Sequence, residues 1–184
     1  VVICADVRDP GNAGTLVRTA DAMGADAVVL AGHSVDPYNA KTVRASVGSL
    51  FHLPVVVEPD TSVAVRAVRA AGLVVLAAEG TGELALDDAG EVLAGPTAWL
   101  FGNEAWGLPD ELAASADHRV RIPLHGAAES LNLATAAAIC LHESARSRGV
   151  PPVSRQGGSA AGGGGAPGPS AGAGRRSGRT ARTP

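Results

Sequence analysis

Short runs of Val, Leu and Ala alternate along the first 150 residues with stretches in which apolar residues recur at helical spacing. Continuous apolar runs of this length are typical of parallel strands that helices cover on both faces. The pattern therefore predicts an α/β fold with a parallel sheet flanked by helices. The expected strands are 1–7, 27–31, 53–57, 73–78, 98–101 and 119–122, and the expected helices are 13–23, 40–50, about 62–71, 109–116 and 131 to about 147.

The composition changes near residue 150. All 18 acidic residues but only 10 of the 15 basic ones lie in the first 150 residues, so that part carries a net charge of −8 and the rest is basic. Residues 151–184 are mostly Gly, Pro, Ala and Ser, which bury too little apolar surface to offset the entropy of ordering the chain. We expect one domain over 1–149 and a disordered Gly/Pro/Ala/Arg-rich tail over 150–184. The tail's arginines could hold nucleic acid by counter-ion release, or the tail could be a solubilising extension.

The apolar runs are far shorter than the roughly 20 residues of a membrane-spanning helix, so we expect a soluble protein with no membrane partner. The chain opens on Val1 in an apolar stretch with no charged leader, which argues against a signal peptide and suggests a fragment. Cys4 and Cys140 lie in apolar segments, which favours reduced, buried thiols in a cytoplasmic protein. The five histidines show no zinc spacing, and no metal site is expected.

A first polar cluster, DPGNAG at residues 9–14, follows the first expected strand. We expect Asn12 to cap the next helix, whose free N–H groups could hold an anion or a polar ligand edge. Arg18 shares a helix face with Gly14 and Asp21, away from the core positions. We expect Gly14 to leave open space beside the Arg18 guanidinium for a phosphate or ribose; an ordinary surface arginine paired with Asp21 is the open alternative.

Two further clusters follow later strands. Residues 101–109, FGNEAWGLP, place two glycines, an amide and a carboxylate after a strand, where open α/β sheets bind ligands and glycine lets a ligand touch the backbone. Turns also favour such residues for conformational reasons alone. Residues 122–133, IPLHGAAESLNL, lead from another strand into the last helix. Alternatively, Ser130 could simply cap that helix.

Other nucleotide and hydrolase signatures are absent from the sequence. Lys41 is the only lysine and no P-loop surrounds it, and the first strand is not followed by G-x-G-x-x-G. The G-x-S-x-G elbow of α/β hydrolases is missing as well. What remains is a nucleotide-sized organic ligand held mostly by backbone groups.

The three clusters, in this order, resemble the SpoU-type (TrmH family) RNA ribose 2′-O-methyltransferases of the SPOUT superfamily. The motif N-x-G-x-x-x-R-[ST]-A matches residues 12–20, the second motif matches 101–104 with Gly107, and the third matches 122–123 and 130–132. The resemblance spans about residues 1–148. It implies a sheet with a C-terminal trefoil knot, a rare exception to the rule against knotted chains, and a homodimer. It also implies S-adenosylmethionine-dependent methylation of a ribose 2′-hydroxyl in structured rRNA or tRNA.

The resemblance implies roles for individual residues. Arg18 of one subunit is expected near the cofactor bound by the other. Because a guanidinium is almost never neutral near pH 7, we expect Arg18 to bind the phosphate beside the target and stabilise the alkoxide, and Glu104 to be the better proton acceptor. The expected catalytic residues are Arg18, Asn12, Glu104, Ser130 and Asn132; those binding S-adenosylmethionine are Ala77, Ala78, Gly80, Leu100, Phe101, Gly102, Asn103, Gly107, Ile122, Pro123, Leu124, Ser130 and Leu131; those binding RNA are Arg8, Arg18, Lys41 and Arg44.

Some features depart from the family or leave alternatives open. Leu124 stands where Met is common and Ala134 where Ser often occurs, changes that should leave cofactor binding intact. Many members carry a separate N-terminal RNA-binding domain, and this sequence begins at the first expected strand of the catalytic domain, so the choice of target RNA is the weakest inference. The acidic balance argues mildly against an RNA enzyme, although the basic RNA-binding candidates cluster in the first 44 residues. A non-catalytic RNA- or cofactor-binding dimeric module of the same fold is the alternative, and the alanines of the last helix predict close helix packing or a dimer seam.

Overall fold

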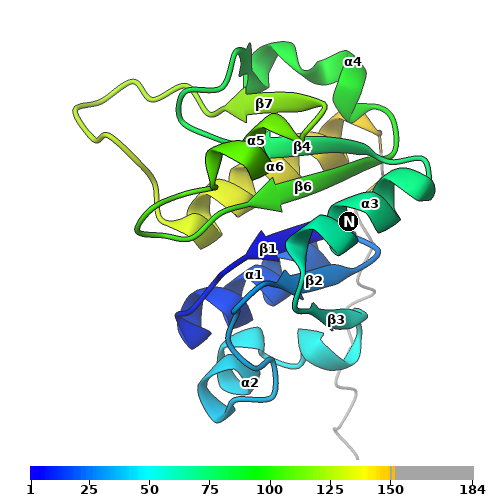
Figure 1. Cartoon of the computed structure of the whole chain (residues 1–184), viewed down its shortest axis with the longest axis vertical. Coiled ribbons are helices and arrows are strands. Elements are labelled where there is room, and N and C mark those ends of the chain that lie inside the picture. The colour runs from blue at the N-terminus through cyan, green and yellow to red at the C-terminus, as the bar shows by residue number, and fades with distance from the viewer. Residues whose placement is uncertain (150, 152–184) are drawn as a thin grey trace, which may run out of the picture. The chain divides into compact units, whose positions relative to one another are not determined.

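The computed structural model describes residues 1–149 and 151 (Figure 1). The tail expected over 150–184 therefore lies outside the described residues, apart from Pro151. The strands are β1 (Val2–Ala5), β2 (Val28–Ala31), β3 (Val55–Glu58), β4 (Val74–Ala78), β5 (Leu84–Ala85), β6 (Thr97–Phe101) and β7 (His118–Arg121); the helices are α1 (Pro10–Ala22), α2 (Ala40–Ser46), α3 (Thr61–Ala70), α4 (Gly90–Leu93), α5 (Asp110–Ala114) and α6 (Leu133–Ser147), with 3-10 turns η1 (Ser49–Phe51) and η2 (Leu86–Asp88).

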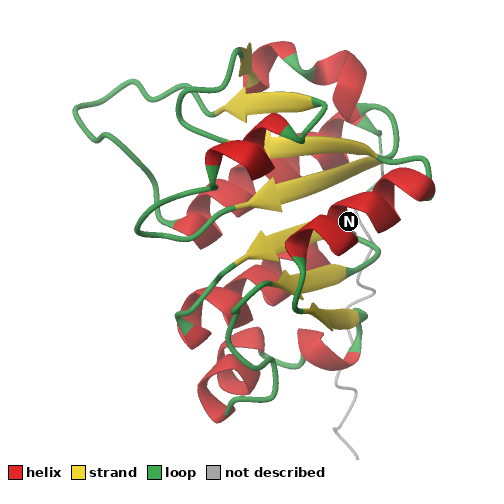
Figure 2. Cartoon of the chain, viewed as in Figure 1, coloured by secondary structure: helices red, strands yellow, loops and turns green. Residues whose placement is uncertain are grey.

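Across the described residues the strands form one seven-stranded sheet in the order β3-β2-β1-β6-β4-β7-β5. Every pair of neighbouring strands runs parallel. Helices lie on both faces of the sheet, as Figure 2 shows. The α/β class with a flanked parallel sheet is therefore confirmed.

Successive residues of the central strands point to opposite faces of the sheet. Val2 and Cys4 of β1 pack in the cluster that holds Leu16 of α1, whereas Ile3 packs with Val65 of α3 on the other face. Every residue of β1, β2 and β6 is buried, which explains the apolar sequences of β1 and β2 and of residues 98–101 in β6. The expected strands at 27–31 and 98–101 match β2 and β6 closely for this reason.

Helix α1 begins earlier than expected, at Pro10, and its cap is Asp9 rather than Asn12. The Asp9 carboxylate accepts the backbone N–H of Asn12 at 2.8 Å, and Pro10 occupies the first turn, where its missing N–H costs nothing. The expectation that Asn12 caps the helix was wrong. Its side chain is consequently available for contacts outside the helix.

The expectation of open space beside Gly14 was also wrong. A Cβ atom at this position would lie 2.5 Å from the carbonyl oxygen of Thr42 and 2.6 Å from the Cβ of Ala45, both in α2. Gly14 is buried, and it lets α1 and α2 approach closely. The glycine thus serves helix packing within this chain rather than access for a phosphate or ribose.

Helix α6 begins at Leu133, and Asn132 is its cap instead of Ser130. Oδ1 of Asn132 accepts the backbone N–H of Ala134 at 2.9 Å. Ala134 and Ala137 are buried, and α6 packs against α1 and α4, so another helix of the same chain accounts for part of the expected close packing. In the core, Nε1 of Trp99 in β6 donates to Oγ of Ser144 in α6 at 2.8 Å and ties the helix to the sheet.

Short elements escaped the sequence pattern. The strand β5 has 2 residues and α4 has 4, too few for a period to show. The helix expected over 40–50 stops at Ser46, because Val47 (φ 50°) and Gly48 (φ 90°) adopt left-handed conformations before η1.

Both cysteines are free and buried within the core, as expected. Burial raises the pKa of the Cys140 thiol to about 12 and raises that of Cys4 further, with the nearby Glu104 charge adding to the effect on Cys4. Within residues 1–149, no helix has both the length and the apolarity to cross a bilayer. The same part of the chain holds no group of three or more His, Cys, Asp or Glu arranged for a metal ion.

Candidate functional site

Side chains from the three polar clusters meet at one point. Nδ2 of Asn12, in the first turn of α1, donates to Oε1 of Glu104 in the β6–α5 loop at 2.9 Å. Nδ2 of Asn132, at the start of α6, donates to Oδ1 of Asn12 at 3.1 Å. The amide of Asn12 therefore joins three segments that are far apart in the sequence.

The loop that carries Glu104 is held by its own backbone. Asn103 and Gly107 exchange two backbone hydrogen bonds, of 3.0 and 2.9 Å, which close a tight turn around Glu104. Nδ2 of the buried Asn103 donates to the carbonyl of Asp6 at 2.6 Å and anchors the turn beside β1. A Cβ at Gly102 would lie 2.3 Å from the carbonyl carbon of Gly107, so glycine at 102 is required by the turn itself. The loop that carries Glu104 is thus held in one conformation by contacts within the chain.

A cavity of about 340 Å³ opens beside this junction. Its walls come from the ends of β4, β6 and β7, from the Glu104 loop and from the segment before and at the start of α6. The lining residues are Ala78, Glu79, Gly80, Phe101, Gly102, Asn103, Glu104, Ala105, Gly107, Val120, Ile122, Leu124, Glu129, Ser130, Leu131, Leu133 and Ala136.

Most residues expected to bind S-adenosylmethionine lie in this lining. Ala77, Leu100 and Pro123 do not. Ala77 and Leu100 are buried on the opposite face of the sheet, because successive strand residues alternate between faces, and only their neighbours Ala78 and Phe101 reach the cavity side. Of the expected catalytic residues, Glu104 and Ser130 line the cavity. Asn12 stands at its edge through the hydrogen bond to Glu104, and Asn132 is linked to that edge through Asn12.

The cavity is acidic. Glu79, Glu104 and Glu129 contribute carboxylates, and among the described residues no Lys, Arg or His lines it. Sequence reasoning missed Glu79 and Glu129 as site residues. Position alone would have pointed to Glu79, because it directly follows β4 at the carboxyl end of the sheet, where ligands bind. The charge suits a cationic organic ligand.

The basic residues expected to bind RNA lie outside the cavity lining. The Arg8 guanidinium carbon stands 5.6 Å from the ring centroid of Trp106, a cation–π contact. Nζ of Lys41 pairs with Oδ1 of Asp9 at 3.1 Å. The Asn12 N–H and, after it, Lys41 lower the pKa of the Asp9 carboxyl. Arg18 and Arg44 are exposed on α1 and α2.

The fold and the site define a class of α/β protein, in which the strand ends and loops of an open parallel sheet surround an acid-lined cavity. Residues 1–142 match the model of the SpoU rRNA Methylase family. The chain belongs to this family.

Known relatives are similar over most of the described residues. A 23S rRNA (uridine(2479)-2′-O)-methyltransferase of Streptomyces viridochromogenes is 42% identical over 144 residues, 76% of this chain and 50% of the relative. The 23S rRNA (guanosine(2553)-2′-O)-methyltransferase RlmP of Bacillus subtilis is 42% identical over 146 residues, 77% of this chain and 56% of the relative. The chain therefore spans about half the length of these two relatives.

The fold is similar to that of solved SpoU enzymes. The crystal structure of the SpoU methyltransferase AviRb from Streptomyces viridochromogenes, in complex with the cofactor AdoMet, matches with a TM-score of 0.73 and 40% identity. The match covers 80% of this chain and 59% of that one.

Proposed function

We propose that this chain forms the catalytic part of an RNA ribose 2′-O-methyltransferase that uses S-adenosylmethionine. The single observation that carries the proposal is the junction of Asn12, Glu104 and Asn132 at the edge of an acid-lined cavity. Each of these residues comes from a different motif of the family. The activities of the two similar relatives, both 2′-O-methyltransferases of 23S rRNA, support rRNA as the substrate class, with tRNA as the alternative substrate.

The residues present fit the proposed cofactor. Apolar side chains, including Phe101, Ile122 and Leu124, offer a surface for an adenine ring, and the cavity carboxylates complement the positive charges of a sulfonium and an ammonium group. Gly80 has no heavy atom within 4 Å of a Cβ position, so a ligand can lie against its backbone. S-adenosylmethionine, when bound, supplies a methyl group on its sulfonium sulfur.

The chain's own residues supply alignment and proton handling. Glu104 accepts the proton that leaves the ribose 2′-hydroxyl when the 2′ oxygen is methylated. Asn12 orients the Glu104 carboxylate by donating a hydrogen bond of 2.9 Å to it. Asn132 holds the Asn12 amide in turn, and Ser130 stands on the wall where the ribose is aligned. Arg18 stays positively charged, binds the phosphate next to the target and stabilises the developing negative charge on the oxygen.

A homodimer forms part of the proposal because the site needs Arg18. Within the described residues of one chain, Arg18 is exposed on α1 and is not part of the cavity lining. A second copy would bring its Arg18 to the cavity of the first. Sedimentation of the purified chain as a dimer is the expected result, and a monomer that methylates RNA would contradict it.

The trefoil knot and a cytoplasmic location belong to the same proposal. The knot is supported by the course of the chain, since β4, β6 and β7 are neighbours in the sheet and the segment after β7 returns to the Asn12 and Glu104 side before α6 begins. The cytoplasmic location is supported by the relatives that act on rRNA and tRNA, which are bacterial proteins and meet these RNAs in the cytoplasm.

Calorimetry followed by a transfer assay tests the function. The chain is titrated with S-adenosylmethionine and then incubated with total rRNA and, separately, tRNA, after which 2′-O-methyl positions are mapped. Binding with transfer to a ribose hydroxyl supports the proposal. Binding without transfer favours the alternative of a dimeric binding module of the same fold, and failure to bind the methyl donor contradicts both.

A further inference from the structure

One carboxylate oxygen in the cavity wall is buried without a partner. Oε2 of Glu79 and Oγ1 of Thr42 are the two side-chain polar atoms, among the described residues, that are shielded from solvent and make no hydrogen bond. Thr42 lies in α2, away from the cavity, whereas Glu79 lines it. A buried acceptor that is left unpaired is costly, and the cost is larger for a charged group. The position of Glu79 therefore calls for a donor from outside the chain.

The backbone holds Glu79 firmly in this position. Its N–H donates to the carbonyl of Val120 at 2.9 Å, which continues the pairing between β4 and β7 by one residue. Its own carbonyl accepts the N–H of Gly82 at 3.0 Å, which closes a turn. With both backbone groups bonded, the side chain leaves from a fixed point at the carboxyl end of β4.

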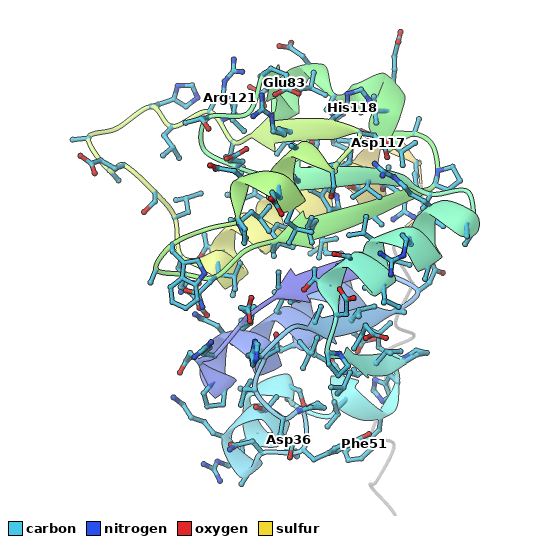
Figure 3. The ribbon with its side chains drawn as sticks, in the orientation of Figure 1. Asp36, Phe51, Glu83, Asp117, His118 and Arg121 are labelled. Atoms are coloured by element: carbon cyan, nitrogen blue, oxygen red, sulfur yellow. The ribbon has the colours of Figure 1, made fainter. Side chains whose placement is uncertain are left out.

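The turn after Glu79 is clamped to β7. A Cβ at Gly82 would lie 2.7 Å from the backbone carbon and oxygen of Arg119, so only glycine fits there. Nη1 of Arg121 donates to the carbonyls of Gly82 and Glu83, each at 2.9 Å, and Nε of Arg119 pairs with Oε2 of Glu83 at 2.9 Å. Figure 3 shows Glu83 and Arg121 next to each other on this side of β7.

The same clamp explains why no Lys, Arg or His within residues 1–149 forms an ion pair with Glu79. Arg119 and Arg121, the arginines of the neighbouring strand β7, direct their guanidinium groups to Glu83 and to the turn carbonyls. Backbone N–H groups of Glu83 and Arg119, and then the Arg119 guanidinium, lower the pKa of the Glu83 carboxyl, which is the expected mark of a structural ion pair. Two acidic residues of one turn thus differ in their partners: Glu83 has its partners within the chain, and Glu79 faces the cavity.

We propose that Glu79 is a positioning residue for the methyl donor, an inference that rests on the proposed function. Its buried Oε2 accepts a hydrogen bond from a donor group of the bound ligand, either a ribose hydroxyl or the ammonium of the methionine part. Binding satisfies the unpaired oxygen, so the chain is preorganised for the ligand at the expense of its own stability when free.

The test uses Glu79→Gln in the full chain, with Glu91→Gln as a matched control. Glu91 is exposed in α4, outside the cavity lining. Calorimetry with S-adenosylmethionine is expected to give about a tenfold to hundredfold weaker Kd for Glu79→Gln and an unchanged Kd for Glu91→Gln. Without ligand, Glu79→Gln is expected to unfold at the same temperature as the unsubstituted chain or higher, because a buried unpaired charge has been removed.

Two further ligands identify the donor group. S-adenosylhomocysteine has the ribose and the ammonium but no sulfonium, and methylthioadenosine has the ribose alone. A loss of affinity for all three ligands assigns the ribose hydroxyls, and a loss for S-adenosylmethionine and S-adenosylhomocysteine alone assigns the ammonium; either result supports the inference. A loss confined to S-adenosylmethionine overturns it, because a sulfonium donates no hydrogen bond.

The stability measurement separates a ligand role from a structural one. If Glu79→Gln unfolds at a clearly lower temperature when free, the residue is structural and the inference is wrong. Should Glu79→Gln not fold at all, Glu79→Asp, which keeps the charge but shortens the side chain, must still bind more weakly than the unsubstituted chain. Unchanged binding by Glu79→Gln overturns the inference and leaves the proposed function intact, whereas a chain that binds no S-adenosylmethionine without any substitution overturns the proposed function itself.

Discussion

Asn12 and Glu104 are 92 positions apart in the sequence, and Nδ2 of the first donates to Oε1 of the second at 2.9 Å. The contact depends on features that neither residue supplies. Asp9 caps α1 and so leaves the Asn12 side chain available, while the Asn103–Gly107 turn holds Glu104 in place. The relationship makes the Glu104 carboxylate a fixed acceptor at the cavity edge.

Asn12→Asp keeps the oxygen that accepts from Asn132 but replaces the donor to Glu104 with a second carboxylate. Two carboxylates at hydrogen-bond distance repel each other, and the pKa of one is raised. We expect RNA methylation to fall by about a hundredfold or more, and further than in Asn12→Ala, which removes the hydrogen bond without adding repulsion. The measurement is the rate of methyl transfer to rRNA at saturating S-adenosylmethionine.

The same exchange at Asn39 is the control. Asn39 caps α2 by accepting the Lys41 N–H, and an aspartate there can accept the same bond. Asn39→Asp should retain the rate and stability of the unsubstituted chain. Because Asn12 does not line the cavity, Asn12→Asp should bind S-adenosylmethionine normally; an unchanged transfer rate in this variant would exclude Asn12 as the residue that orients Glu104.

Arg18→Lys tests the role proposed for the exposed guanidinium of α1. Lysine keeps the positive charge but loses the planar fork that binds phosphate through two hydrogen bonds. We expect methyl transfer to fall by about tenfold to hundredfold while binding of S-adenosylmethionine is retained. Arg66→Lys, an exposed change of the same kind in α3, should have no effect. Near-normal turnover of Arg18→Lys would show that only its charge is needed.

The sequence predicts the buried strands well and the tertiary contacts poorly. Strands such as β2 are covered on both faces, so their apolar runs appear directly in the sequence. Asn12 and Asp9 are both good helix caps, and Pro10 decides between them because its ring suits the first turn. Gly14 packs closely against the backbone of α2, and no local sequence pattern predicts this contact.

The site shows the same division. The motifs predict Asn12, Glu104 and Asn132 as site residues from their types and order, and the structure brings the three side chains into contact. The position of Glu79 directly after β4 is visible in the sequence, but the burial of its Oε2 depends on the tertiary packing and is not. The absence of Ala77 and Leu100 from the lining follows from strand alternation, which becomes usable once the register is known.

Gly14→Ala tests the close packing of α1 on α2. The added Cβ would meet the Thr42 carbonyl at 2.5 Å, and backbone atoms cannot move aside as a flexible side chain can. Overpacking of this kind lowers the free energy of unfolding by about 1–3 kcal/mol, measured by urea denaturation. Gly90→Ala in α4 is the matched control, because a Cβ there has no heavy atom within 4 Å. Equal stabilities of the two variants would contradict the packing role.

The contacts of Asp117 make the stability of the folded chain depend on pH. Its Oδ2 accepts the Val75 N–H at 2.8 Å and its Oδ1 pairs with Nη2 of Arg69 at 2.8 Å. The Val75 N–H first, and Arg69 after it, lower the pKa of the Asp117 carboxyl in the folded chain. Because the unfolded chain takes up this proton more readily, the stabilisation is complete above the ordinary Asp pKa of about 3.9 and is lost as the pH falls through the lower folded value.

The measurement compares the chain with Asp117→Asn in urea between about pH 6 and pH 3. The free energy of unfolding should decline on acidification in both proteins. The decline should be less steep in Asp117→Asn, because this variant has no carboxylate at position 117 whose protonation could remove the contribution. Asp88→Asn, an exposed change in η2, should decline as the unsubstituted chain does. Parallel curves for Asp117→Asn and the unsubstituted chain would mean that the Val75 and Arg69 contacts contribute little in solution.

We expect Trp106 to contact the RNA. The indole is 57% exposed on the turn that carries Glu104, and Arg8 lies over its ring. An exposed aromatic surface beside a cation suits a nucleic-acid base, whose stacking on an aromatic side chain is worth about 1–3 kcal/mol. We expect Trp106→Ala to bind RNA about tenfold more weakly at fixed salt, and Trp106→Phe to retain most of the affinity. Tyr38→Ala, which removes another exposed aromatic ring, should bind normally.

Salt dependence distinguishes stacking from charge at this position. Arg8→Ala removes a cation, so the slope of log Kd against log salt should become smaller by about one ion, whereas Trp106→Ala should leave the slope unchanged. The double variant should lose less affinity than the two single losses combined, because each residue supports the other through their contact. Strictly additive losses would mean that Arg8 and Trp106 bind RNA independently, and unchanged RNA affinity of Trp106→Ala would remove the base-stacking role altogether.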